Sequence, residues 1–199
     1  YNKQIFEENA VEVPTTYEEF LEVCQTLKDN SVTPMALCGT DAWIPAQFVQ
    51  QIAGGMAGDQ LFKDVCAGEE KWNNEIHVKA AKEVKEMADR GYFQDGYIGM
   101  GPEESTDLFM NGKTAMYFQG AWDADKVAKS SVGENVGAFV LPAYDAQYNN
   151  ISVGSVDTSF AVSKNCKNVD AAVAFLKYWT SQELSLIHIS EPTRHAQIS

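Results

Sequence analysis

Apolar side chains recur at helical spacing along much of this chain, and short unbroken apolar runs lie between those stretches. Thr16-Tyr17-Glu18-Glu19 has the form of a capping box, in which Thr16 and Glu19 satisfy each other's backbone N–H groups. It predicts a helix that begins there and runs to about Asn30. The same spacing predicts helices over residues 43–53, 76–90, 103–111, 121–129 and 169–180, and the apolar runs predict strands over 33–38, 114–118, 136–141 and 159–163. Helices that alternate with short apolar strands predict an α/β layered fold.

Single positions add finer predictions. Gly54-Gly55 is expected to end the helix over 43–53, whereas residues 62–72 show no clear pattern. Cys24 falls on the apolar face of its helix, which predicts that it packs in the core. His77 lies just beside the apolar stripe of its own helix, which predicts a solvated surface position.

Charge and cysteine content exclude several classes of function. Lys+Arg number 15 against 28 Asp+Glu, and the formal net charge of −13 argues against a nucleic-acid partner. No apolar run reaches the roughly 18 residues of a membrane-spanning helix. The 4 cysteines form no Cys-x-x-Cys pair and have no His at ligand spacing, so we expect free thiols and no metal. No phosphate-binding loop or other cofactor motif is present, so no cofactor is predicted.

The two ends of the chain do not read as natural termini. Tyr1 is preceded by neither an initiator Met nor a signal peptide, so the chain is expected to start inside a longer protein that carried any export signal or lipid anchor. The stretch Leu184-Ser-Leu-Ile-His-Ile-Ser-Glu-Pro-Thr-Arg194 resembles the translation of a transposase-type adapter used to prepare DNA sequencing libraries. We therefore expect residues 184–199 to be a non-native tail that either extends the last helix or has no regular structure, with few long-range contacts. Its histidines, His188 and His195, support no catalytic or metal site.

Several segments in order resemble the extracellular solute-binding proteins of family 1, the maltose-binding type. Tyr-Asn-Lys-Gln-Ile-Phe at residues 1–6 resembles the family's Y-N-K-x-x-F, and residues 13–20 resemble its P-x-T-W/Y-x-E-F helix start. Residues 109–116 resemble F-x-x-G-K-x-A-M and are followed by a G-x-W at 120–122. Val-Ser-Lys-Asn at 162–165 and the helix end at 178–183 complete the set, although Cys166 replaces the more usual Ser or Ala.

The resemblance implies a class II periplasmic-binding-protein-like fold, α/β and two-lobed, of which mostly the C-terminal lobe is present. Residues 1–152 would form that lobe, with a hinge crossover at 1–5. Residues 153–183 would form the hinge and the segment that returns to the N-terminal lobe. The implied function is the carbohydrate-binding component of an ABC transporter, which closes on a mono- or oligosaccharide and delivers it to permease subunits. Such a protein is extracellular, as a cell-surface lipoprotein or in the periplasm, and it contacts the membrane only through a lipid anchor or the permease.

Aromatic and acidic residues follow two of the predicted strands. A neutral sugar is bound by aromatic rings against its C–H face and by fixed polar groups at its hydroxyls. Trp122 and Asp123 follow the strand over 114–118, at the edge where ligands bind in open α/β sheets. Asp41 and Trp43 hold a similar place after the strand over 33–38, and Trp43 resembles a second aromatic platform of the family.

These residues also allow purely structural interpretations. Asp123 can cap a helix while Trp122 packs against it, and Asp41 can be an N-cap with Trp43 as a hydrophobic staple. Asp157, in the returning hinge segment, is a further candidate contact for the sugar.

Two other functions, those of a glycosidase and of a sensor-coupled binding module, were compared with this one. A glycosidase needs two carboxylates across a glycosidic bond, and none of the acidic residues lies in a motif that requires catalysis, so no enzyme activity is expected. A sensor-coupled binding module would share the same lobe, and the sequence does not separate it from a transport component.

Overall fold

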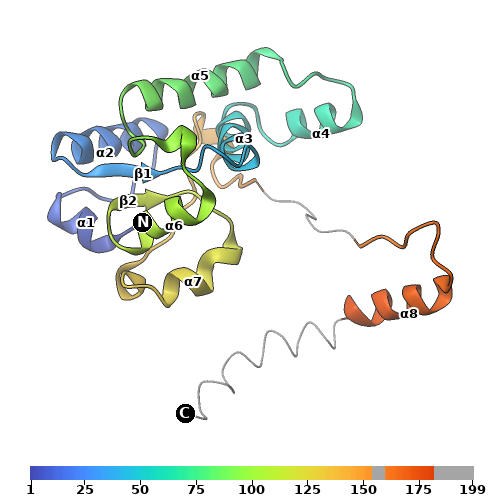
Figure 1. Ribbon diagram of the computed structural model, residues 1–199. Coiled ribbons are helices and arrows are strands. Elements are labelled where there is room, and N and C mark those ends of the chain that lie inside the picture. Colours follow the sequence, from blue (N-terminus) through green and yellow to red (C-terminus); the bar gives the residue numbers. More distant parts are fainter. Residues whose placement is uncertain (154–159, 182–199) are drawn as a thin grey trace, which may run out of the picture. The chain divides into compact units, whose positions relative to one another are not determined.

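The computed structural model describes residues 1–153 and 160–181 and divides the chain into two compact units, Tyr1–Val153 and Gly154–Ser199. The first unit contains two parallel strands, β1 (Thr33–Ala36) and β2 (Thr114–Tyr117), with Met35 opposite Met116. Helices α2, α3 and α5 lie beside β1, and α6 and α7 lie beside β2 (Figure 1). The helices are α1 Lys3–Glu8, α2 Tyr17–Asp29, α3 Trp43–Ala57, α4 Gln60–Ala67, α5 Glu75–Asp89, α6 Pro102–Met110 and α7 Ala124–Ala128.

Helix starts follow from capping residues in the sequence. The predicted capping box is confirmed, because Glu19 N donates to Thr16 Oγ1 and the Glu19 carboxylate accepts from Thr16 N. Asn74 accepts from His77 N to begin α5, and Pro102 occupies the first turn of α6, where its missing N–H costs no hydrogen bond.

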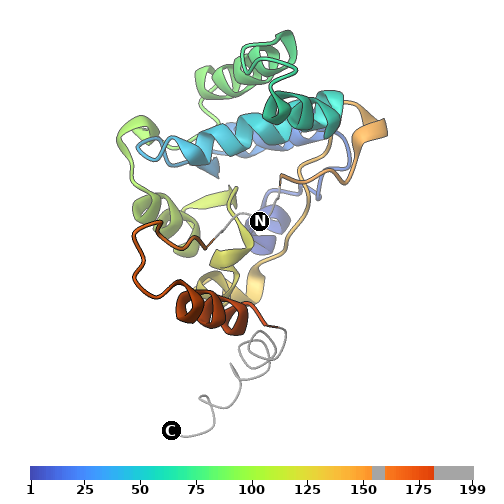
Figure 2. The ribbon, with the colours of Figure 1, turned by 90° about the vertical axis from the view of Figure 1, so that its right-hand side faces the viewer.

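The core lies between the strands and the helices that pack on β1. It includes the predicted Cys24, which is fully buried, together with Leu27 and Phe48. The Phe48 ring lies 4.9 Å from the ring of Phe118, just beyond β2. Helices α3 and α5 pack against each other over this core (Figure 2). The apolar face that the sequence predicts for the helix from Thr16 to Asn30 is therefore a buried face.

Two local predictions were wrong for reasons of packing. Helix α3 continues through Gly54-Gly55 to Ala57, because both glycines are buried and a Cβ on Gly55 would lie 3.1 Å from the backbone of Ala143. His77 is buried rather than solvated: its two ring nitrogens meet Asn74 and Gln50, and burial lowers its pKa.

The strand predicted over 136–141 was wrong as well. Only Val136 makes a bridge, antiparallel to Asn2, and the described structure has no ladder over the residues that follow. Of the strand predicted over 159–163, residue 159 lies outside the described residues, and 160–163 form no strand within them. Extended segments become strands only when a neighbour supplies backbone partners.

The second unit contains helix α8 (Val169–Trp179), capped by Asn168. We expect its apolar face to be partly exposed, and this is confirmed: Phe175 is 58% and Trp179 46% exposed, with their rings 5.9 Å apart. The adapter-like tail over 184–199 lies outside the described residues. The four cysteines all lie within the described residues and are unpaired.

Stability should depend on the protonation of the amino terminus. The Tyr1 ammonium is buried against Gly137, and desolvation, helped by Lys3, lowers its pKa from 8.0 to about 6. Between pH 6 and 8 the unfolded chain therefore binds more protons, so raising the pH stabilises the fold. We expect the free energy of unfolding to rise by about 2 kcal/mol across this range in urea titrations of a chain that begins at Tyr1. Nα-acetylation removes the titrating group, and an unchanged pH slope after acetylation would contradict the assignment.

Candidate functional site

The carboxyl ends of β1 and β2 place two short connections side by side. Because the strands are parallel neighbours, the segments that leave them emerge at the same edge of the pair. From β1 the chain runs through residues 37–42 to Trp43, the first residue of α3. From β2 it runs through Gly120 into the short 3₁₀ turn η2 (Ala121–Asp123), which contains Trp122.

The two tryptophans meet at this edge. Their ring centroids are 5.8 Å apart and their planes are inclined by 57°. Trp43 is 44% and Trp122 55% exposed, although Ile44, next to Trp43, is buried. The fold therefore brings together two residues that are far apart in the sequence and leaves much of both indole rings open to solvent. Adjacent exposed aromatic rings of this kind make this surface a candidate binding site.

Glycines at both connections allow this arrangement. A Cβ on Gly120 would lie 2.2 Å from the Trp122 ring, so the indole occupies space that any other residue at position 120 would fill. A Cβ on Gly39 would lie 2.4 Å from the carbonyl oxygen of Tyr97. This close approach lets the Gly39 and Thr40 N–H groups both donate to the carbonyl oxygen of Met100. The position of the loop that leads to Trp43 is thereby fixed.

Asp123 is held by a hydrogen-bond network centred on Tyr117. The Tyr117 hydroxyl donates to Asp123 Oδ2 over 2.9 Å, because a carboxylate can only accept. Gln119 Nε2 donates to the Tyr117 oxygen, and Thr106 Oγ1 lies within hydrogen-bond distance of it. Burial is the main cause that raises the pKa of Tyr117 to about 12, so the hydroxyl remains a donor at neutral pH. Among the described residues only Oδ2 of Asp123 accepts a hydrogen bond, so Oδ1 can accept one from a ligand.

The structure brings some of the predicted site residues together, but not all of them. It brings Trp43 and Trp122 together and places Asp123 in the same turn as Trp122, whereas Asp157 lies outside the described residues. The capping alternatives for the two other acids were wrong: Ala42 rather than Asp41 precedes α3, and Asp123 makes no side-chain cap on α7.

Sequence reasoning missed the residues that support Asp123. Tyr117, Gln119 and Thr106 belong to no motif that the chain displays, and Thr106 comes from a different element, α6. Tyr117 is the last residue of β2, and Gln119 follows two positions later. This spacing of polar side chains at a strand end was the available signal.

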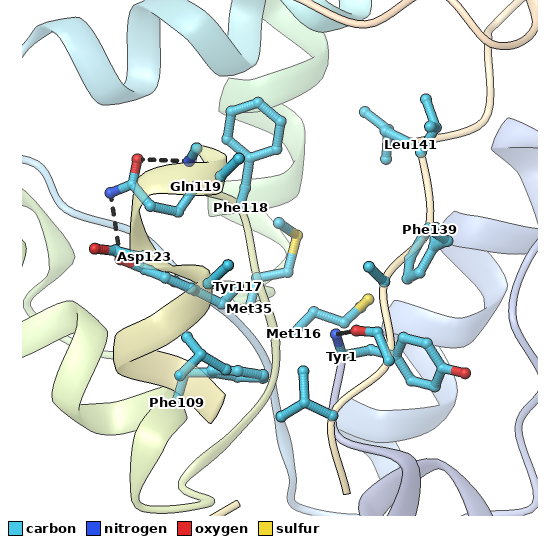
Figure 3. A pocket seen from close by; sticks show the side chains of 18 of the residues that line it. Tyr1, Met35, Phe109, Met116, Tyr117, Phe118, Gln119, Asp123, Phe139 and Leu141 are labelled. Atoms are coloured by element: carbon cyan, nitrogen blue, oxygen red, sulfur yellow. Dashed lines mark hydrogen bonds between the residues drawn. The ribbon is translucent and has the colours of Figure 1, made fainter. Parts of the chain in front are cut away.

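A cavity of about 550 Å³ lies next to this site. Asp123 and Gln119 line part of its wall, with Met116 and Phe118 from β2 and its continuation, and Phe139 lies across it (Figure 3). Neither Trp43 nor Trp122 lines it. Within the described residues no group of three His, Cys, Asp or Glu side chains is arranged to hold a metal ion.

Two parallel strands covered by helices, with an exposed aromatic pair and a fixed carboxylate at their carboxyl ends, define an α/β domain with a candidate ligand site. Residues 1–184 match the sequence model of the bacterial extracellular solute-binding proteins, and the chain belongs to this family. It is 25% identical, over 91% of its length, to the multiple sugar-binding protein of Streptococcus mutans serotype c. It covers 44% of that relative, so it spans less than half of the curated protein.

Solved structures agree with this family. A chitin oligosaccharide binding protein superposes with a TM-score of 0.70 and 27% identity, over 74% of this chain and 38% of that one. A family 1 extracellular solute-binding protein from Bifidobacterium longum subsp. infantis gives a TM-score of 0.73 at 22% identity, over 96% of this chain and 50% of its own. The predicted fold class, α/β and of the two-lobed periplasmic-binding type, is confirmed. Among the described helices, none is long and apolar enough to cross a membrane.

Proposed function

We propose that the full-length protein is the extracellular carbohydrate-binding component of an ABC transporter, and that Trp43, Trp122 and Asp123 contribute to its sugar site. The observation that carries this proposal is the exposed pair of indole rings 5.8 Å apart at the edge where both strands end. A sugar ring has an apolar C–H face that stacks on such a surface. Its hydroxyls can donate hydrogen bonds to a fixed carboxylate. The sugar-binding relative and the chitin oligosaccharide binding protein support the ligand class.

The remaining parts of the proposal follow from the family. Residues 1–152 would be the C-terminal lobe, with its hinge crossover at 1–5, and 153–183 the hinge and returning segment, with Asp157 and Asp41 as further ligand contacts. The permease subunits of the transporter would be the protein partners. A lipid anchor or a periplasmic location would depend on sequence before Tyr1. Binding would occur without turnover, which an assay for hydrolysis of the bound oligosaccharide tests.

Asp123→Asn should weaken sugar binding in the full-length protein by about five- to tenfold. The amide keeps an oxygen for the Tyr117 hydroxyl, but it loses the charge that strengthens hydrogen bonds from sugar hydroxyls. A hydrogen bond to a charged group contributes about 1–1.4 kcal/mol more than one between neutral groups. Calorimetric titration with a panel of neutral oligosaccharides measures the dissociation constant.

Asp125→Asn is the matched control for this experiment. Asp125 lies two residues further on, is exposed, and pairs with Lys129 over 2.6 Å on the surface of α7. This variant should bind as the wild type does. Equal affinities for the Asp123→Asn and wild-type proteins would remove Asp123 from the proposed site.

A further inference from the structure

A buried glutamine continues the pairing of β1 beyond the point where the strand ends. Gln94 is only 7% exposed, and it directly follows Phe93, which forms a parallel bridge with Met35 of β1. After Gln94 the chain turns away through Gly96, whose φ is 73°. Beside Leu37, the first residue after β1, a side chain takes the place of a neighbouring backbone.

The carboxamide of Gln94 bonds both backbone groups of Leu37. Leu37 N donates to Gln94 Oε1 over 2.9 Å, and Gln94 Nε2 donates to the Leu37 carbonyl oxygen over 2.6 Å. This double exchange has the pattern of a hydrogen-bonded pair in an antiparallel ladder, here made by a side chain. Gln94 Nε2 also donates to Met100 Sδ, 3.0 Å away, so both of its hydrogens have partners. The orientation of the amide follows, because a backbone N–H can only donate.

Three alternate N–H groups along this stretch are bonded to the same neighbouring segment, residues 92–100. The three bonds run from Met35 N to Tyr92 O, from Leu37 N to Gln94 Oε1 and from Gly39 N to Met100 O. Alternate residues of an extended chain face the same side, so the three bonds form one continuous edge that reaches from β1 into the connection to α3. The middle bond is the only one of the three with a side-chain acceptor, and it is therefore the one that a substitution can remove.

We propose that Gln94 is a positioning residue of the candidate sugar site, which holds the connection from β1 so that Trp43 lies against Trp122. This inference rests on the proposed function, because it assigns a role in the same site. Gln94 acts through the backbone, since it is buried and its carboxamide is bonded to Leu37 and Met100. Trp43 is 44% exposed, so its own packing does not fix it, and a binding side chain needs support to about 0.5 Å.

Gln94→Leu should weaken sugar binding without touching the sugar. Leucine fills a similar volume but leaves both backbone groups of the buried Leu37 without these partners, which favours movement of the connection toward water. In the full-length protein we expect the dissociation constant for neutral oligosaccharides to rise at least about tenfold. The reason is that a displaced Trp43 gives up part of the contact that an indole makes with a sugar ring. Calorimetric titration measures this change.

A second measurement reports the position of the rings without any sugar. The indoles of Trp43 and Trp122, 5.8 Å apart, couple electronically, and their exciton band in circular dichroism depends on the distance and angle between them. Trp122→Ala identifies this band by removing one ring. In the 199-residue chain the band should weaken in Gln94→Leu.

Gln94→Glu tests the hydrogen-bond pattern itself and stays measurable if Gln94→Leu fails to fold. The ionised carboxylate accepts from Leu37 N but has no hydrogen for the Leu37 carbonyl, whereas the protonated acid donates one and restores both bonds. Burial raises the pKa of a carboxyl, and the groups bonded to it here, the Leu37 backbone and the Met100 sulfur, do not titrate. The dissociation constant of this variant, divided by that of the wild type at the same pH, should therefore fall at least about threefold from about pH 9 to about pH 5.

Val23→Ala is the control for loss of stability alone. Val23 is buried in α2, which contributes no residue to the connection or to the indole pair, so this variant should melt earlier and keep both affinity and exciton band. A Gln94→Leu protein with affinity within about threefold of wild type and an unchanged band would overturn the proposal. A ratio for Gln94→Glu that does not change with pH would overturn it as well. If the wild type bound none of the sugars, the proposed function would be wrong, whereas the exciton band would still decide whether Gln94 positions Trp43.

Discussion

Gly39→Ala should lower the free energy of unfolding of this chain by about 2–3 kcal/mol, the upper part of the range for overpacking. The added Cβ would lie 2.4 Å from the Tyr97 carbonyl oxygen and 2.5 Å from the Ile98 Cα. Both contacts are with backbone, so no side chain can rotate away, and the two loops must separate. Separation would strain the hydrogen bonds from Gly39 and Thr40 to the Met100 carbonyl. Urea titration at constant pH measures the loss.

Gly99→Ala is the matched control, since Gly99 lies in the loop that Gly39 contacts. A Cβ at Gly99 would meet nothing within 4 Å, so this substitution should change stability by less than about 0.5 kcal/mol. If both variants unfolded at the same urea concentration, the close approach of the two loops would not be a constraint on the fold.

How far the sequence predicts this fold depends on whether a signal is local. The capping box at Thr16 and the apolar face with Cys24 involve neighbours along one helix, and both were predicted. The role of Gly39 could not be predicted, because its contact with Tyr97 joins residues that are far apart in the sequence. Helix α3 passes through Gly54-Gly55 for the same kind of reason: the distant Ala143 packs on Gly55.

The same distinction between local and long-range signals applies to the candidate site. The position of Trp43 and Trp122 at strand ends could be predicted, because strand-to-helix connections are visible as a change of apolar pattern. Their contact depends on β1 and β2 being neighbours, which the pattern alone does not determine. The network of Thr106, Tyr117 and Asp123 was missed because it joins α6 to β2 through side chains that are ordinary in both elements.

The second large expected effect concerns the aromatic pair of Trp43 and Trp122. In the full-length protein, Trp122→Ala should weaken sugar binding by somewhat less than a hundredfold. A stacked indole gives up roughly 100 Å² of apolar contact, about half of an aromatic side chain's typical burial. At about 25 cal/mol per Å² this corresponds to about 2.5 kcal/mol. Stability should fall by no more than about 1 kcal/mol, because Trp122 is 55% exposed and its main ring partner is the half-exposed Trp43.

Measuring affinity and melting temperature on the same variants distinguishes a platform from a packing residue. Trp72→Ala is the matched control, since Trp72 is 58% exposed and contacts the rings of Phe62 and His77 away from the strand ends. It should lose a similar small amount of stability and keep wild-type affinity. Gly120→Ala adds an independent check, because its Cβ displaces the Trp122 ring and leaves the indole itself in the chain. It should therefore weaken binding while tryptophan fluorescence reports the moved ring. A loss of affinity below threefold in Trp122→Ala, together with a clear fall in melting temperature, would show that Trp122 packs the turn and does not hold the sugar.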